Sequence, residues 1–235
     1  MFDQIGQFFT NIFTSRTWQV LVDSFPRLLG YFVEVTIPLT ILAFALALVV
    51  SVIVAMLQYA QVKVLRQLCR FYIWIVRGTP LLVQLYLVFY GLPSLGIVLE
   101  AFPAAVVVIG LNEGAYMAES LRGSLEAVPR GQMEAGWCVG LNYLQIMWHV
   151  VLPQAFRSAF PALSNSLISM VKSTSLAASI TVMEMFRQAQ VINGRVYESL
   201  GLYGEVALIY LLFCTLLTFL QRRGEKRLNR YGGVK

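Results

Sequence analysis

Residues 35–62 contain no charged side chain, and this stretch restricts what the chain can fold into more than any other feature. About 20 apolar residues in a helix cross the roughly 30 Å hydrocarbon core of a bilayer, and this stretch is longer than that. Charged residues make up only 13% of the sequence and hydrophobic residues 58%. Soluble domains carry about 25% charged residues, so we expect an all-α integral membrane protein.

Four further apolar stretches of spanning length follow the first one. They cover about residues 78–99, 103–125, 156–183 and 203–221. We therefore predict a transmembrane domain of five helices at 31–221, between a segment at 1–30 and a basic tail at 222–235. Aromatic residues recur at roughly helical spacing in residues 1–30, which suits a helix lying in the outer interface or, equally well, a poorly ordered leader. This segment lacks the basic start of a cleaved signal peptide.

Basic residues are unevenly shared among the segments that join the spans. Most of them lie in the tail, between the first two spans, or between the third and fourth spans. The basic residues of these two connections are Lys63, Arg66, Arg70, Arg77 and Arg130. Lys and Arg accumulate on the cytoplasmic side of membrane proteins, so the C-terminus is predicted to be cytoplasmic. Five spans then place the N-terminus outside. The net charge of +6 is explained by this orientation and does not indicate nucleic acid as a partner.

The longest polar connection, residues 126–153, is cytoplasmic in this orientation. Its motif residues are Glu134, Ala135, Gly136, Gly140, Val150, Leu152 and Pro153. Their spacing resembles the "EAA" loop of ABC importer permeases, with Gly136 and Val150 in place of Ala and Ile. The resemblance implies a type I ABC importer permease fold in which this coupling loop docks on an ATPase subunit.

Other segments resemble the polar amino acid permeases within that family. These segments are residues 77–82, 90–93, 115–119 and 171–177, although Ser173 stands where many relatives have Asp. Residues 184–190 resemble members that transport L-cystine. The resemblance implies an importer in the bacterial inner membrane, with a dimer of ATPase subunits, a second and preferably identical permease copy, and an extracytoplasmic substrate-binding protein. ATP and Mg²⁺ belong on the ATPase, because this chain has no GxxxxGK[ST] motif and no cofactor is expected in it.

Polar side chains on the third and fourth spans predict a substrate cavity. Ionisable groups inside a membrane are costly and usually functional. The candidate substrate-binding residues are Arg77, Asn112, Glu113, Tyr116, Asn165, Ser169, Lys172 and Ser173. Glu113 is expected to accept the ammonium of an amino acid, and Asn165 with Ser169 to donate to its carboxylate. Lys172 would tune the potential of the cavity.

Two other groups on the third span have a structural interpretation. Glu119 and Arg122 are spaced to form an i,i+3 ion pair. Gly110, Gly114 and Ala118 form a stripe of small residues that favours close helix packing over ligand binding.

No catalytic or metal site is expected. Cys69, Cys138 and Cys214 are widely separated, and His149 is the only histidine. Two alternative functions remain at this stage, an ion-coupled secondary transporter and a membrane sensor or assembly factor. The former predicts an inverted repeat with broken helices, and no convincing repeat is found in the sequence.

Overall fold

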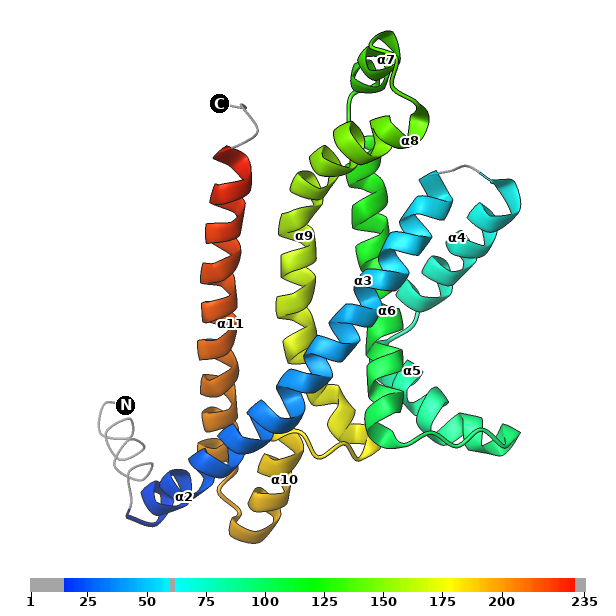
Figure 1. Cartoon of the computed structure of the whole chain (residues 1–235). Helices are drawn as coiled ribbons and strands as arrows, with labels where there is room; N and C mark the ends of the chain where they lie inside the picture. Colours follow the sequence, from blue (N-terminus) through cyan, green and yellow to red (C-terminus); the bar gives the residue numbers. More distant parts are fainter. Residues whose placement is uncertain (1–14, 60–61, 231–235) are drawn as a thin grey trace, which may run out of the picture.

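The computed structural model describes residues 15–59 and 62–230, which are helical apart from short connections and contain no strand. The described part of the chain begins with a nearly continuous helix that starts at one end of the bundle and runs toward the other, made of α2 (Ser15–Tyr31), the π-helical turn η1 (Phe32–Thr36) and α3 (Ile37–Tyr59) (Figure 1). The described part of the first predicted span therefore makes up the larger part of this helix, which begins before the span, at Ser15. Residues 1–14 of the predicted leader lie outside the described residues. The rest of it, α2, packs on the last two helices of the chain, α10 (Met185–Val196) and α11 (Ser199–Arg230).

The second predicted span is not a straight helix. It is preceded by α4 (Lys63–Arg77) and contains a second helical segment, α5 (Leu81–Tyr86), η2 (Leu87–Gly91) and η3 (Leu92–Leu95), which is bent by 102° relative to α4. Pro80 stands at the break, where its missing N–H and fixed φ favour the start of a new helix. Residues 63–77 were expected to be a connection between spans. They are helical because Cys69 and Ile73 bury one face against the bundle.

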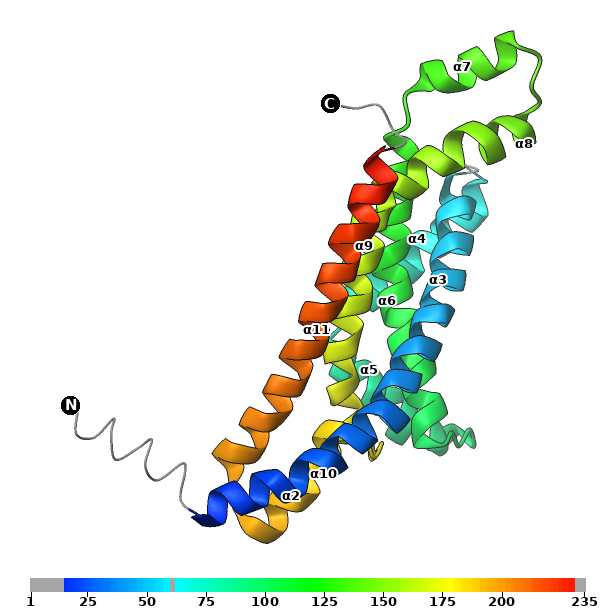
Figure 2. The ribbon, with the colours of Figure 1, turned by 60° about the vertical axis from the view of Figure 1, so that its left-hand side comes forward.

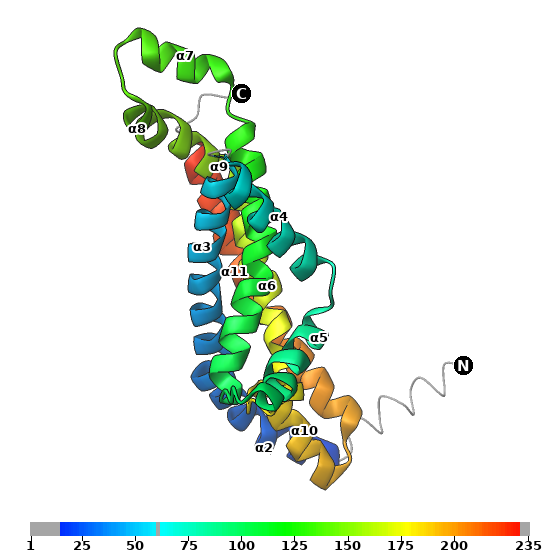
Figure 3. The ribbon, with the colours of Figure 1, turned by 90° about the vertical axis from the view of Figure 1, so that its right-hand side faces the viewer.

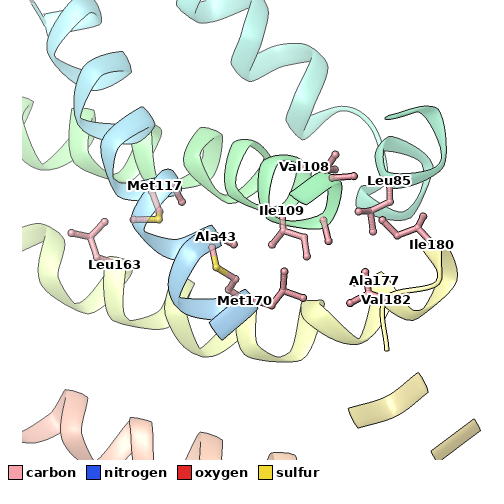
Figure 4. Close-up of a cluster of buried hydrophobic side chains, with 14 of the residues drawn as sticks. Ala43, Leu85, Val108, Ile109, Met117, Leu163, Met170, Ala177, Ile180 and Val182 are labelled. Atoms are coloured by element: carbon pink, nitrogen blue, oxygen red, sulfur yellow. The ribbon is translucent and has the colours of Figure 1, made fainter. Parts of the chain in front are cut away.

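Helix α6 (Ala101–Glu126) lies at the centre of the bundle, between α3 and α9 (Leu152–Ser173). Figure 4 shows side chains from α3, α5, α6, α9 and the turn η5 (Thr174–Ile180) meeting in the main core cluster. A Cβ atom added to Gly110 would lie 2.8 Å from Leu46 Cδ2, and one added to Gly114 would lie 3.1 Å from Val50 Cγ1. The predicted small-residue stripe is therefore the contact surface between α6 and α3.

Residues 127–151 project beyond the end of the bundle (Figure 2). They form α7 (Arg130–Cys138), α8 (Tyr143–Ile146) and the π-helical turn η4 (Met147–Val151), which leads into α9. Gly140 follows α7 with φ +80°, a left-handed conformation that favours glycine and lets the chain reverse direction. Asn142 and Gln145 form a capping box that starts α8. The coupling loop is thus a folded hairpin of two short helices.

Helix α11 packs on α9, whereas α10 packs on α2, α11 and η5. The segment from α8 to η5 is bent by 51° relative to α10, and α11 extends from that end of the molecule back toward α7 (Figure 3). Glu184 is fully buried at the bend and accepts hydrogen bonds from the backbone N–H groups of Phe186 and Arg187, which caps α10. Helix α11 continues past residue 221 through part of the predicted basic tail.

The described residues contain three helices long and apolar enough to cross a membrane, or five if each bent pair is one span. The second count agrees with the five predicted spans. Helices α2 and α10 lie at one end of the bundle, whereas α7, α8 and the last turns of α11 lie at the other (Figure 1).

The predicted orientation can be checked with cysteine reporters at two glycines where a new Cβ meets nothing within 4 Å, Gly194 in α10 and Gly131 in α7. In a background without Cys69, Cys138 and Cys214, we expect an impermeant maleimide to label Gly194→Cys in intact cells. Gly131→Cys should react only after permeabilisation. The opposite labelling pattern would show that the charge distribution had been misread.

Candidate functional site

A cavity of about 630 Å³ lies between α6 and α9, beside the C-terminal end of α4. Seven of the eight predicted substrate-binding residues line it: Arg77, Asn112, Glu113, Tyr116, Asn165, Ser169 and Ser173. Glu119, Ser120, Ser166 and three apolar residues, Leu81, Ala162 and Leu176, complete the wall. The two predicted polar faces therefore do meet in one cavity.

Glu113 is the charged side chain in this cavity that has no oppositely charged partner among the described residues. It lines the cavity together with Ser166 of α9 and forms no salt bridge with any other described residue. The side chain is half-buried, so its carboxylate is partly removed from water. An uncompensated carboxylate in such a place is stabilised by a cation that enters the cavity.

Arg77 brings a positive charge to the same wall. Its guanidinium carbon lies 5.1 Å from the centre of the Tyr116 ring, a cation–π distance, and 4.0 Å separates its Nη1 from the Glu119 carboxylate. Glu119 also forms a short salt bridge with Arg122, which confirms the pair expected from sequence. Arg122 binds Glu126 as well, at 2.6 Å. Because Glu119 is held mainly by Arg122, Arg77 keeps hydrogen-bond donors for a ligand.

Helix α9 supplies neutral polar groups at intervals of four residues. The Asn165 side-chain oxygen accepts a hydrogen bond from Gln221 of α11 at 3.2 Å, which leaves the amide hydrogens of Asn165 without a partner among the described residues. Ser173 donates to the carbonyl of Ser169. Lys172 does not line the cavity, because one helical step turns its exposed side chain away from the stripe.

Gln84 holds the break in the second span against α6. Its amide nitrogen donates to the Val76 carbonyl at 2.7 Å and to the Thr79 hydroxyl at 2.8 Å, while its oxygen accepts from Asn112 at 3.0 Å. Asn112 is buried, so it positions the cavity wall more than it offers a group to a ligand. Sequence reasoning missed Gln84 and Ser166. Gln84 is the lone amide in the apolar run 81–89, and this isolation could have identified it from the sequence.

The coupling loop has an exposed outer surface and a packed inner one. Glu134 and Ala135 are exposed, whereas Gly136 is buried against Ile146, whose Cγ1 would lie 2.7 Å from an added Cβ. The replacement of Ala by Gly in the motif is therefore matched by the bulk of Ile146. Trp137 and Leu144 also expose 52% and 76% of their surface, an apolar area suited to contact with another protein.

The described residues hold no group of three or more His, Cys, Asp or Glu side chains that fits a metal ion. The arrangement instead combines a polar cavity between membrane-length helices with a projecting helical hairpin. These features define a membrane protein of the transporter class.

Residues 47–230 match the family described as binding-protein-dependent transport system inner membrane component, and the chain belongs to this family. It is 43% identical over 219 residues to the L-cystine transport system permease protein TcyB of Bacillus subtilis (strain 168), covering 93% of this chain and 94% of that one. A probable amino-acid ABC transporter permease protein, PatM of Vibrio harveyi, is 40% identical over 213 residues, covering 89% and 95% of the two chains.

Solved structures share this fold. A crystal structure of an amino acid ABC transporter with histidines has a TM-score of 0.82 and 32% identity, covering 88% of this chain and 96% of that one. An inward-facing MetNI methionine ABC transporter has a TM-score of 0.66 at 18% identity, covering 92% and 99%, and this likeness concerns the fold alone. The broken second span is thus compatible with the type I importer architecture and does not point to a secondary transporter.

Proposed function

We propose that this chain is the membrane-spanning permease subunit of an ABC importer that moves a polar amino acid, L-cystine in particular, across the bacterial inner membrane. The observation that carries the proposal is the cavity itself. Its wall contains both the carboxylate of Glu113, which has no salt-bridge partner, and the guanidinium of Arg77. An α-amino acid presents the complementary pair of charges, an ammonium and a carboxylate. The likeness to a cystine permease supports the choice of substrate.

The substrate is held by charge complementarity in this proposal. Glu113, together with Ser166, receives an ammonium group, while Asn165 and Ser169 donate to the carboxylate of the same amino acid end. Cystine has two such ends joined by a disulfide. Arg77 and the Glu119 carboxylate lie on the same cavity wall and match the second end. Lys172 faces away from the cavity and has no role in this proposal.

Energy comes from partner subunits. The coupling hairpin, α7 and α8, docks on an ATPase that carries ATP and Mg²⁺, and a second copy of this chain completes the translocation path. An extracytoplasmic binding protein delivers the amino acid at the end formed by α2 and α10. The exposed Glu134 and Trp137 on the hairpin supply a charged and an apolar contact for the ATPase surface.

The proposal is tested in proteoliposomes that contain the chain with its ATPase, loaded with ATP inside and given labelled cystine with binding protein outside. We expect uptake to require ATP and to persist when ion gradients are collapsed. Glu134→Lys, which reverses the charge of an exposed docking residue, should reduce uptake at least tenfold and leave membrane insertion intact. Glu100→Lys, the same charge reversal at an exposed position outside the hairpin, serves as the control and should leave uptake unchanged.

Two outcomes would contradict parts of this proposal. Uptake driven by a sodium or proton gradient in the absence of ATP would favour the secondary transporter. Unchanged ATP-driven uptake by Glu134→Lys would remove this residue from the ATPase contact. A preference for another amino acid over cystine would keep the transporter class and change only the substrate.

A further inference from the structure

A second cavity, of about 330 Å³, lies between α3, α4 and α6 at the end of the bundle that carries the coupling hairpin. Its polar wall consists of Gln58, Arg66, Arg70, Glu119, Arg122 and Glu126. Three guanidinium groups face two carboxylates, so the wall has one net positive charge. None of the predicted substrate-binding residues lines this cavity.

Both carboxylates of the wall already have a positively charged partner. Glu119 and Glu126 both pair with Arg122, which leaves Arg66 and Arg70 as the remaining cations. These two arginines occupy successive turns of α4, and neither forms a salt bridge with another residue in the described part of the chain. The unpaired charge of the wall is therefore concentrated on α4.

Gln58 of α3 provides an independent sign of a missing ligand. The residue is only 6% exposed, and its amide nitrogen is the one buried side-chain nitrogen or oxygen atom among the described residues without a hydrogen-bond partner. A buried polar group without a partner is destabilising, and such groups are usually satisfied by a ligand or water. The N–H₂ donor and the two guanidinium groups together favour binding of a negatively charged hydrogen-bond acceptor.

The outer face of α4 indicates where this acceptor comes from. Beside the arginines, the helix exposes large apolar side chains, including Leu68, Phe71 and Trp74, and Trp74 also lines the cavity. Aromatic and basic residues combined in this way are typical of helices at the membrane–water interface. Basic pockets between transmembrane helices on the cytoplasmic side are suited to the head groups of anionic lipids.

We propose that this cavity binds a phosphate group carrying a single negative charge, as found in the phosphodiester of an anionic phospholipid. Arg66 and Arg70 pair with the phosphate oxygens and Gln58 donates the third contact. The acyl chains lie along the apolar face of α4. Since Glu119 lines both this cavity and the substrate cavity, an occupied site stabilises the side-chain arrangement that the two cavities share.

The test measures the thermal unfolding midpoint of the complete purified transporter in neutral detergent. Phosphatidylglycerol, phosphatidylcholine and inorganic phosphate are titrated separately. We expect a saturable rise of the midpoint with phosphatidylglycerol and none with phosphatidylcholine. The double variant Arg66→Gln/Arg70→Gln should weaken half-saturation at least tenfold. Arg222→Gln/Arg227→Gln removes the same charge from exposed positions on α11 and should behave like the parent.

Gln58→Leu distinguishes a ligand contact from a packing role. The variant removes an unpaired buried donor, so its midpoint without lipid should equal or exceed that of the parent, while its response to phosphatidylglycerol should shrink. A saturable rise with inorganic phosphate alone would identify free phosphate as the source of the same group. Equal lipid responses in the parent and the Arg66/Arg70 double variant would overturn the proposal. No step of this test depends on transport or on its substrate.

Discussion

Glu113→Gln is expected to raise the substrate concentration for half-maximal uptake by about 10- to 100-fold. Hydrogen bonds to charged groups contribute about 1.5–3 kcal/mol, and each 1.4 kcal/mol corresponds to about tenfold in affinity. The substitution keeps the size of the side chain and its capacity for hydrogen bonds but removes the charge that receives the ammonium. Labelled uptake in proteoliposomes over a range of substrate concentrations measures the effect.

Two controls make this result specific to the substrate. Basal ATP hydrolysis without substrate should be unchanged in Glu113→Gln, because the coupling hairpin is remote in the fold from α6 residue 113. Glu205→Gln is a matched variant, since Glu205 is a partly buried carboxylate on α11 that binds Ser24 and does not line the cavity. An identical concentration dependence in the parent and Glu113→Gln would leave Glu113 as a solvated structural carboxylate.

Gly110→Leu should prevent the chain from accumulating as a stable, detergent-soluble protein. A Cβ at this position already lies 2.8 Å from Leu46 Cδ2 and 3.0 Å from the Ala43 carbonyl oxygen, and a Leu side chain needs still more space. Inserting bulk into a well-packed core costs about 1–3 kcal/mol per substitution and more where backbone blocks relaxation. The measurement is the monodisperse fraction on size-exclusion chromatography of a fluorescent fusion.

Gly123→Leu is the matched control on the same helix. No atom lies within 4 Å of a Cβ built at Gly123, and Leu has a higher helix propensity than Gly by roughly 0.8 kcal/mol. This variant should therefore be at least as stable as the parent, and Gly110→Ala should fall between the parent and Gly110→Leu. Equal recovery of Gly110→Leu and Gly123→Leu would show that α3 and α6 are not packed through this stripe.

The sequence predicted both cavity-lining helices well because their chemistry is periodic. On α9 the residues Asn165, Ser169 and Ser173 recur every four positions, so they share one face whatever the helix packs against. The same spacing rule fails for Lys172, whose side chain is exposed and does not line the cavity. The Glu119–Arg122 pair was predictable for the same reason, since it lies within one helical turn.

The broken second span was not predictable from hydropathy. Residues 78–99 are uncharged and long enough to cross a membrane, and residues 63–77 carry four basic residues that suggested a polar connection. The structure instead buries Cys69 and Ile73 of α4 against α6 and turns the chain at Pro80. Hydropathy averages over a window, so it registers the total apolar content but not which face of α4 is buried.

Local sequence alone determined the membrane class, the apolar stretches and the motif of the coupling hairpin, because each depends on residues close together in the chain. Tertiary structure alone decided which separate polar groups meet. Only packing brought Arg77 beside Tyr116 and Glu119, connected Gln84 to Asn112, and placed Gln58 opposite Arg66 and Arg70. These contacts join residues from different helices, and the relative positions of helices are set by small-residue contacts such as that of Gly110 with Leu46. The small-residue stripe of α6 was visible in the sequence, but the helix that packs against it was not.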